Sequence, residues 1–301
     1  MKVIDLFSGC GGFTLGFQNA GFDVVAGFEN WQPAIDIYTI NFKHPVINVD
    51  LSEITDYNIF SRYNPDVIIG GPPCQDFSSA GKRNENNGRG DLTVSFAEII
   101  INVLPKWFVM ENVERILKTQ ILKTAKNLFK LNGYGLTEII LDASYCGVPQ
   151  ARKRYFLIGL LNEEDDCMLY YLKKNIAQKK MTIYDYLGNL LGLEYYYRHP
   201  RSYARRGVFS IHESSPVIRG VNRPMPKGYS RHEGDPAECL DNIRHLTTKE
   251  RSLIQTFPDD FKWSGSKTEQ EQIIGNAVPV NLAAFVGNAV MDYIQDSEKV
   301  V

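Results

Sequence analysis

The stretch Asp66-Val67-Ile68-Ile69-Gly70-Gly71-Pro72-Pro73-Cys74-Gln75 joins an apolar, strand-like run to a polar loop. Each proline fixes its own φ, so the segment presents Cys74 from a stiff backbone. In open α/β sheets, ligands bind just beyond the carboxyl ends of the strands. This position favours Cys74 as a nucleophile, although a lone cysteine is more commonly a small buried thiol.

Around this stretch, the first 161 residues alternate short apolar runs with amphipathic segments. Such alternation predicts a Rossmann-like, mostly parallel, doubly wound sheet. The expected strands are Val3–Phe7, Val24–Phe28, Val46–Val49, Val67–Ile69, Trp107–Met110, Thr137–Leu141 and Tyr155–Leu160. The expected helices are Phe13–Asn19, Pro33–Asn41, Thr93–Leu104 and Val113–Leu131.

The alternation of strand-like and helix-like segments ends after Glu163. Residues 196–240 are basic and rich in proline, serine and glycine. We therefore expect a smaller, loop-rich second domain. Helical patterns return at Thr247–Phe257, which Thr247 or Thr248 can cap, and at Pro279–Ile294.

The 301-residue chain has a net charge of only -2, which gives no global argument for a nucleic-acid partner. Residues 198–231, however, hold eight Lys/Arg against one acid, a local charge of +7 that is typical of a phosphate-backbone binder. The five cysteines are scattered without a CxxC pair, so we expect no metal site and no disulfide framework. Without a signal peptide or an apolar run of membrane-spanning length, we expect a cytoplasmic protein.

Glycines and acids follow the first strands. The turn Ser8-Gly9-Cys10-Gly11-Gly12 lies between a strand and a helix, where glycine lets a ligand approach the backbone. Thr14 stands where a dinucleotide fingerprint has its third glycine. Glu29 and Asp50 end the second and third expected strands. Because these acids and the glycine turn all follow the ends of expected strands, together they favour an adenosine-containing ligand.

Charged residues also follow later strands. Glu111 ends the strand that begins at Trp107, and a carboxylate beside a candidate nucleophile suits proton donation to a ring nitrogen. Arg152 and Arg154 lie two residues apart, on one face of an extended segment, and paired arginines can hold a base carbonyl and a phosphate.

Taken together and in order, these motifs resemble those of DNA (cytosine-5) methyltransferases. The matching segments are Phe7–Gly12, Gly71–Gln75, Glu111–Val113, Gln150–Arg154, Arg244–Phe261 and Gly275–Pro279. The resemblance runs from end to end except for the variable basic region. It implies a Rossmann-like fold that binds S-adenosylmethionine, with a smaller target-recognition domain.

The resemblance implies a role for each matching position. Cys74 is expected to attack carbon 6 of cytosine, Glu111 to stabilise ring nitrogen N3, Arg154 to bind oxygen O2, and Arg152 to position the nucleophile and a nearby phosphate. The residues expected to bind S-adenosylmethionine are Phe7, Gly9, Gly11, Gly12, Glu29, Asp50, Leu92, Asn276 and Val278. Asn30 stands where the family has a bulky side chain that stacks on adenine, and Trp31 follows it.

A base stacked in duplex DNA must be flipped out before it can react, and residues 76–91 suit a lid over it. The expected DNA contacts are Gln75, Ser78, Lys82, Arg83, Arg89, Arg205, Arg206, Arg219 and Arg223. Residues 1–165 plus 270–301 would form the catalytic domain, and residues 166–269 the target-recognition domain. There Val217-Ile218 stands where the family usually has a Thr-Leu or Thr-Ile pair.

The main hypothesis is a sequence-specific DNA cytosine-5 methyltransferase of compact prokaryotic or phage type. It would work as a monomer on double-stranded DNA and protect host DNA from a partner restriction endonuclease. One alternative is a transfer-RNA methyltransferase of the same family, whose usual Cys-Phe-Thr signature is missing here. Another is an inactive DNA-binding protein, which would be expected to lose Cys74, Glu111 or Arg154.

Overall fold

The computed structural model describes residues 1–73, 92–200, 202 and 204–299. The expected nucleophile, Cys74, lies outside the described residues. So do the expected DNA contacts Gln75, Ser78, Lys82, Arg83 and Arg89.

A seven-stranded sheet forms the centre of the larger part, in the order β3-β2-β1-β4-β5-β8-β6. Neighbours among the first five strands of this order run parallel, and β8 runs antiparallel to both β5 and β6. The expected mostly parallel sheet is therefore confirmed. The strands are β1 (Lys2–Leu6), β2 (Asp23–Glu29), β3 (Val46–Asn48), β4 (Val67–Gly70), β5 (Trp107–Asn112), β6 (Tyr134–Asp142) and β8 (Lys153–Leu161).

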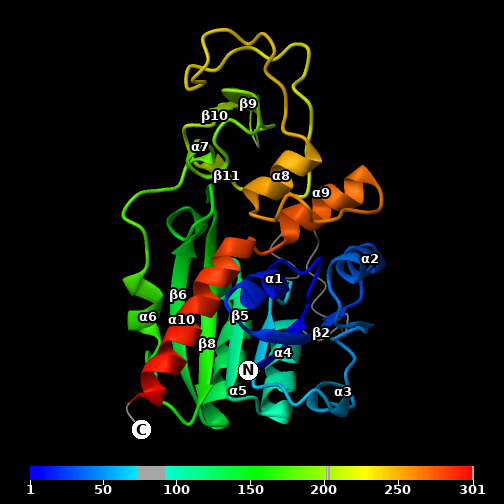
Figure 1. The fold of residues 1–301 in the computed structure, drawn as a ribbon, viewed down its shortest axis with the longest axis vertical. Coiled ribbons are helices and arrows are strands. Elements are labelled where there is room, and N and C mark those ends of the chain that lie inside the picture. Colours follow the sequence, from blue (N-terminus) through cyan, green and yellow to red (C-terminus); the bar gives the residue numbers. More distant parts are fainter. Residues whose placement is uncertain (74–91, 201, 203, 300–301) are drawn as a thin grey trace.

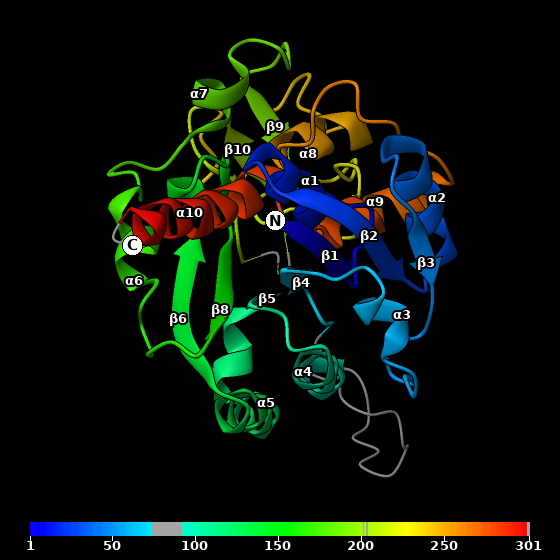
Figure 2. The same ribbon diagram turned by 60° about the horizontal axis from the view of Figure 1, so that its bottom comes forward.

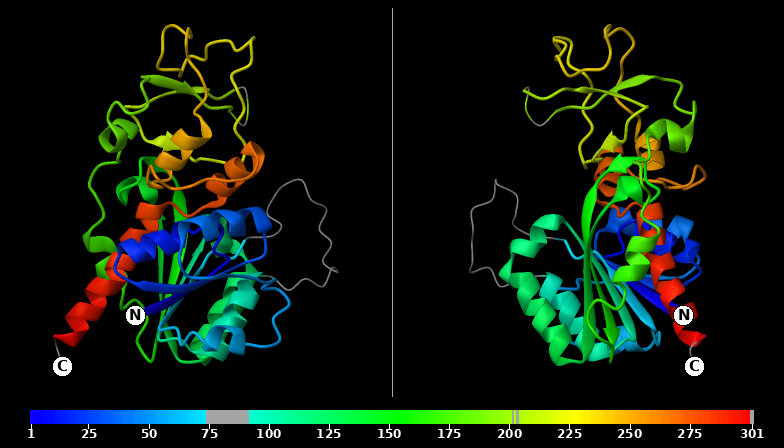
Figure 3. Two further views of the ribbon diagram at one scale, coloured as in Figure 1. Left: turned by 45° about the vertical axis from the view of Figure 1, so that its right-hand side comes forward. Right: turned by 90° about the vertical axis from the view of Figure 1, so that its left-hand side faces the viewer.

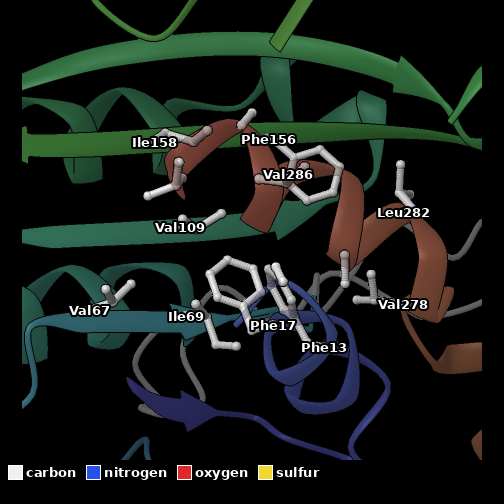
Figure 4. Packing of buried hydrophobic residues seen from close by; sticks show 14 of the residues in the cluster. Phe13, Phe17, Val67, Ile69, Val109, Phe156, Ile158, Val278, Leu282 and Val286 are labelled. Carbon is white, nitrogen blue, oxygen red and sulfur yellow. The ribbon is translucent and has the colours of Figure 1, made fainter. Parts of the chain in front are cut away.

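Helices cover both faces of this sheet, as Figures 1 and 2 show. On one face α1 (Gly12–Asn19) packs against α10 (Val280–Glu298). On the other face lie α4 (Leu92–Val103) and α5 (Gln120–Leu131). A Cβ added to Gly16 would lie 2.3 Å from that of Ala283, so only glycine lets α1 and α10 approach this closely. Figure 4 shows the phenylalanines and aliphatic side chains buried between these two helices and the sheet.

Helices α9 (Lys267–Asn276) and α10 follow one another and together form a long, apolar stretch. Among the described residues, Lys267–Glu298 is the one stretch that could cross a membrane by length and composition, and 67% of its most apolar window is buried inside the protein. Its side chains Leu282, Ala283 and Val286 belong to the core cluster beside the sheet. This burial is typical of a core helix.

Two helical expectations need correction. The expected helix Val113–Leu131 is a 3₁₀ turn (Glu114–Lys118) followed by α5, because the Thr119 side chain caps α5 by accepting from the backbone N–H of Leu122 at 3.2 Å. The sequence analysis also missed α9 (Lys267–Asn276), which Ser266 and Glu269 begin with a reciprocal capping box. The remaining helices around the large sheet are α2 (Gln32–Asn41), α3 (Asn58–Ser61) and α6 (Leu169–Lys174).

A loop-rich part lies beyond the carboxyl ends of the parallel strands (Figures 1 and 3). Its short strands β9 (Tyr195–Tyr197) and β10 (Val208–Ser210) pair antiparallel, while β11 (Ser215–Pro216) pairs with β7 (Gln150–Ala151). Helices α7 (Ile183–Leu187) and α8 (Thr248–Ile254) complete it, and Thr247 caps α8 as expected. Its buried cluster is Ile183, Leu191, Tyr196, Phe209, Ile211, Ile218, Leu246, Ile254 and Ile274.

Buried contacts cross both of the expected domain boundaries. Leu172 follows the first boundary, yet it packs into the core cluster beside the sheet. Ile274 follows the second, yet it packs into the cluster of the loop-rich part. The boundaries at 165/166 and 269/270 stay a prediction.

Candidate active site and cofactor pocket

The turn between β1 and α1 has an unusual backbone. Phe7 has a φ of 58°, a conformation that is costly for a bulky side chain and that concentrates at functional sites. Gly9 and Gly11 also have positive φ, of 53° and 90°. A Cβ added to Gly12 would lie 2.4 Å from the carbonyl oxygen of Val278, so glycine is required where the turn meets the C-terminal segment.

Glu29 holds this turn in place. Its Oε2 accepts from the backbone N–H of Gly9 at 2.8 Å, and its Oε1 accepts from those of Asn30 at 2.9 Å and Trp31 at 3.0 Å. The carboxylate at the end of β2 therefore joins two strand ends. Three of its roughly four acceptor positions are then used, which leaves one on Oε2 for a ligand's hydroxyl group.

A cavity of about 300 Å³ opens at the carboxyl ends of β1, β2 and β3. Of the residues expected to bind the cofactor, the cavity is lined by Phe7, Gly9, Gly12, Glu29, Asp50, Leu92, Asn276 and Val278. Gly11 does not line it; a Cβ there would lie 2.2 Å from the ring of Phe42, so this glycine serves packing. The cavity is also lined by Leu51, Pro73 and Ile273, which no sequence motif indicated, and by Trp31, for which no role was predicted.

Beneath the turn lies a buried polar chain that the sequence analysis also missed. The Thr14 hydroxyl donates to Oδ2 of Asp5 at 2.6 Å and lies 2.9 Å from the Tyr38 hydroxyl, which lies 2.7 Å from Nε2 of His44. Burial raises the pKa of Asp5 to about 7. The Asp5–Thr14 contact had only two signals in the sequence. Asp5 is an acid inside an apolar strand, and Thr14 follows nine residues later in a helix.

Glu111 and Arg154 form an ion pair at the ends of β5 and β8. Arg154 Nε lies 2.8 Å from Glu111 Oε1, and the two side chains are only 14% and 11% exposed. The end of β4 runs beside them, since a Cβ added to Gly71 would lie 3.3 Å from Glu111 Oε2. Asn112 Nδ2 donates to the Pro72 carbonyl at 3.0 Å, so the end of β5 anchors the residues that lead to Cys74.

Arg152 lies differently from the expectation. Its side chain is 2% exposed, and its guanidinium donates to the carbonyls of Ile218, Gly275 and Ala277, each at 3.2 Å. Burial, and then the charge of Arg154, lowers its pKa to about 9. In this arrangement Arg152 cannot reach a DNA phosphate, which corrects that part of the expectation. Its expected action on Cys74 stays a prediction.

Two buried thiols that the structure describes are poor nucleophiles. Cys10 lines the cavity but is 2% exposed, and burial raises its pKa to about 12. Burial likewise raises the pKa of Cys146 to about 12. A thiolate is the reactive form of cysteine, so these two residues remain inert thiols near neutral pH.

An open cleft of about 1160 Å³ separates the sheet from the loop-rich part. Cationic side chains line it from both sides: Arg115, Lys153, Arg154, Lys180, Arg198, Arg205, Arg206 and Arg219. Of the expected DNA contacts, Arg223 does not line this cleft and instead borders a smaller hollow. Arg206 pairs with Glu213 and stacks 4.4 Å from the Phe209 ring centroid, whereas Arg205 is exposed.

A Rossmann-like sheet with a cavity beyond β1–β3 and an acid–arginine pair facing a basic cleft defines the class of nucleic-acid methyltransferases. The chain belongs to the family of C-5 cytosine-specific DNA methylases, whose family model matches residues 1–292. It is therefore a DNA cytosine-5 methyltransferase.

Known relatives agree over the whole chain. The type II methyltransferase M.HindV of Haemophilus influenzae is 59% identical over 295 residues, which cover 97% of each chain. M.HgiDI of Herpetosiphon aurantiacus is 52% identical over 98% of this chain and 95% of its own. The structure of Schizosaccharomyces pombe Dnmt2 matches with a TM-score of 0.75 over 98% of this chain and 99% of its own, and at 20% identity it supports the fold alone.

Proposed function

We propose that this enzyme methylates carbon 5 of a flipped-out cytosine in duplex DNA through a covalent bond to Cys74. The observation that carries the proposal is the position of the Glu111–Arg154 pair. Arg154 lines the basic cleft, Glu111 lies beside Gly71, and Pro73 lines the cofactor cavity. A base held at this pair would therefore lie between the DNA-binding cleft and the methyl donor.

The cavity suits S-adenosylmethionine. Its glycine turn exposes backbone to the ligand, Glu29 retains acceptor capacity for a ribose hydroxyl, and Asp50 lies at the end next to β3 for the adenine. Trp31 and Leu51 supply apolar wall for a purine ring. When bound, S-adenosylmethionine supplies an electrophilic methyl group.

The chain's own residues would prepare cytosine to accept that group. The Cys74 thiolate forms a bond to carbon 6, and the electron pair of the 5,6 double bond moves toward carbon 5. Glu111 shares a proton with N3 while Arg154 donates to O2, so both stabilise charge as it develops on the ring. After carbon 5 gains the methyl group and loses its proton, the electron pair re-forms the double bond and Cys74 leaves as thiolate.

Duplex DNA would lie in the basic cleft. Its phosphates would meet cationic side chains from both sides of the cleft, among them Lys153, Lys180 and Arg205. The loop-rich part, approximately residues 166–269, would read base edges as the target-recognition domain. Because its relatives are type II methyltransferases, we propose that the enzyme works in the cytoplasm as a monomer and protects DNA from a partner endonuclease.

Base-resolved mapping of cytosine methylation tests this proposal. Unmethylated genomic DNA and transfer RNA are each incubated with the enzyme and S-adenosylmethionine, and 5-methylcytosine is mapped in both. We expect methylation of one short DNA sequence and none of the RNA. 5-Methylcytosine confined to RNA, or its absence from both nucleic acids, would overturn the proposal.

A further inference from the structure

Three buried polar side chains connect the cleft to the cofactor cavity; together we call Gln150, Arg152 and Gln255 the Gln–Arg junction. Their exposed fractions are 0%, 2% and 0%. Gln150 lies on β7, Arg152 lies between β7 and β8, and Gln255 directly follows α8. Polar groups this deeply buried are costly unless each finds partners, so their partners indicate what the junction fixes in place.

On the cleft side, the junction holds both backbone groups of a single residue. The N–H of Ile218 donates to Gln150 Oε1 at 2.9 Å, and the carbonyl of Ile218 accepts from Arg152 at 3.2 Å. The two neighbours of Ile218, which are Val217 and Arg219, line the basic cleft. The junction therefore fixes the rim against which DNA is proposed to bind.

On the cofactor side, the junction holds the end of α9. Arg152 donates to the carbonyls of Gly275 and Ala277, each at 3.2 Å. Gln255 Nε2 donates to the carbonyls of Ile274 at 2.5 Å and Ala277 at 3.2 Å. Ala277 itself lines the cofactor cavity, as do the adjoining Asn276 and Val278.

The two sides are joined directly. Gln150 Nε2 donates to Gln255 Oε1 at 2.6 Å, which closes the network between the rim and the cavity wall. The backbones also touch, since a Cβ added to Gly275 would lie 2.2 Å from the backbone nitrogen of Gly220. Neither segment can shift alone without leaving buried donors or acceptors unpaired.

We propose that the Gln–Arg junction is a positioning device that makes the binding of DNA and of cofactor cooperative. DNA that settles against residues 217–219 fixes Ile218, and through the junction it fixes residues 274–277, which hold the cofactor. By linkage, bound cofactor favours DNA to the same degree. This inference rests on the proposed function and adds to it the path that couples its two sites.

Calorimetry on the full chain tests the coupling. The probes are S-adenosylhomocysteine, which is the demethylated cofactor, and a duplex bearing the methylated site mapped above. The coupling factor is the Kd of S-adenosylhomocysteine without DNA divided by its Kd with saturating DNA. For the unaltered enzyme we expect a factor of about 5 or more, the lower end of typical allosteric coupling.

Two variants cut the junction at different points. Gln255→Met removes the bonds to Gln150 and to α9. Gln150→Glu keeps the acceptor for Ile218, removes the donor to Gln255 and places a buried carboxyl group against Gln255 Oε1. Gln270→Met is the matched control, because Gln270 lies on α9 and its side chain hydrogen-bonds, within the described part of the chain, only to the Gly265 carbonyl at 3.1 Å. In both junction variants the coupling factor should fall toward 1 while each ligand alone binds within about 3-fold of its original affinity.

The possible results separate the two proposals. An unchanged coupling factor in Gln150→Glu, or an equal fall in Gln270→Met, overturns the role of the junction. So does a coupling factor of 1 in the unaltered enzyme when both ligands bind. Failure of the unaltered enzyme to bind S-adenosylhomocysteine or DNA would instead overturn the proposed function. Thermal unfolding detects whether Gln255→Met folds. If it does not fold, the coupling factor of Gln150→Glu alone tests the role of the junction.

Discussion

At the scale of residues, the active site joins a carboxylate, a guanidinium and a tightly held strand end. The Glu111–Arg154 pair is 2.8 Å long, and Asn112 fixes Pro72 beside it. In the proposed function, Glu111 serves the ring nitrogen of a base that Arg154 holds.

Glu111→Gln tests that task. Glutamine preserves the size of the side chain but can neither share a carboxyl proton nor carry the charge that pairs with Arg154. We expect the single-turnover rate of methylation to fall by about 10²–10⁴-fold, the usual contribution of general acid–base catalysis, while S-adenosylhomocysteine binds with little change. A rate within a few fold of the original would contradict the role.

Asp5 gives a prediction about pH. Its pKa is raised by burial from 3.8 to about 7, so the folded state binds more protons than the unfolded state between these values. The free energy of unfolding should therefore decrease as pH rises from about 4 to about 7, and this contribution should be lost above that range.

Asp5→Asn removes this titration and keeps an acceptor for Thr14. Relative to the original enzyme, the variant should gain about 1–4 kcal/mol in unfolding free energy between pH 5 and pH 8. Denaturant titrations at both pH values measure the change. A difference between the two proteins that stays constant with pH would show that Asp5 does not titrate in this range.

At the scale of elements, caps and turns decide where the helices begin and end. Thr247 begins α8 with a capping box, in which its hydroxyl accepts from Glu250 and the Glu250 carboxylate accepts from the Thr247 N–H at 2.7 Å. Thr256, with a φ of 62°, lies just beyond the helix end and turns the chain toward the core.

Thr247→Ala should lower the free energy of unfolding by about 1 kcal/mol, the usual cost of losing an N-cap side chain. Thr124→Ala is the matched control, because Thr124 lies inside α5 and bonds only to a carbonyl of the preceding turn. Urea unfolding compares the two variants. Equal effects would mean that the capping box contributes nothing specific.

Local patterns explain which elements were predictable. Short apolar runs separated by amphipathic segments indicated all seven strands of the large sheet, and the most buried of the parallel strands, such as β4, are continuous apolar runs. The break at Thr119 was missed because apolar spacing continues across it. Helix α9 was missed because its polar and charged first two turns show no apolar spacing. Its buried residues Ile273 and Ile274 are adjacent and belong to two different clusters.

At the scale of the whole molecule, the cofactor cavity joins segments from both ends of the chain. Glu29 and Asp50 were predictable because the carboxyl ends of parallel strands meet at one edge, whereas Asn276 came from the family resemblance alone. The burial of Arg152 was not predictable. Its partners are carbonyls 66, 123 and 125 residues away, and no local pattern encodes them.

The cleft gives a prediction about salt. Arg205 is exposed and lines the cleft, so removing its charge should release one fewer counterion when DNA binds. Arg205→Ala should weaken DNA binding and reduce the slope of log K against log salt by about 1. Arg62→Ala should leave the slope unchanged, because Arg62 directly follows α3, which lies at the far end of the sheet from the loop-rich part (Figure 1). The same slope in both variants would remove Arg205 from the interface.

The central claim is that Cys74 attacks the target cytosine. The most direct measurement incubates the enzyme with S-adenosylmethionine and a duplex that carries 5-fluorocytosine at the mapped site, followed by a denaturing gel and peptide mass mapping. Fluorine cannot leave as a proton does, so the covalent complex should persist. We predict one DNA adduct on the peptide that contains Cys74, and none with Cys74→Ser. An adduct on another residue, or methyl transfer by Cys74→Ser, would contradict the account.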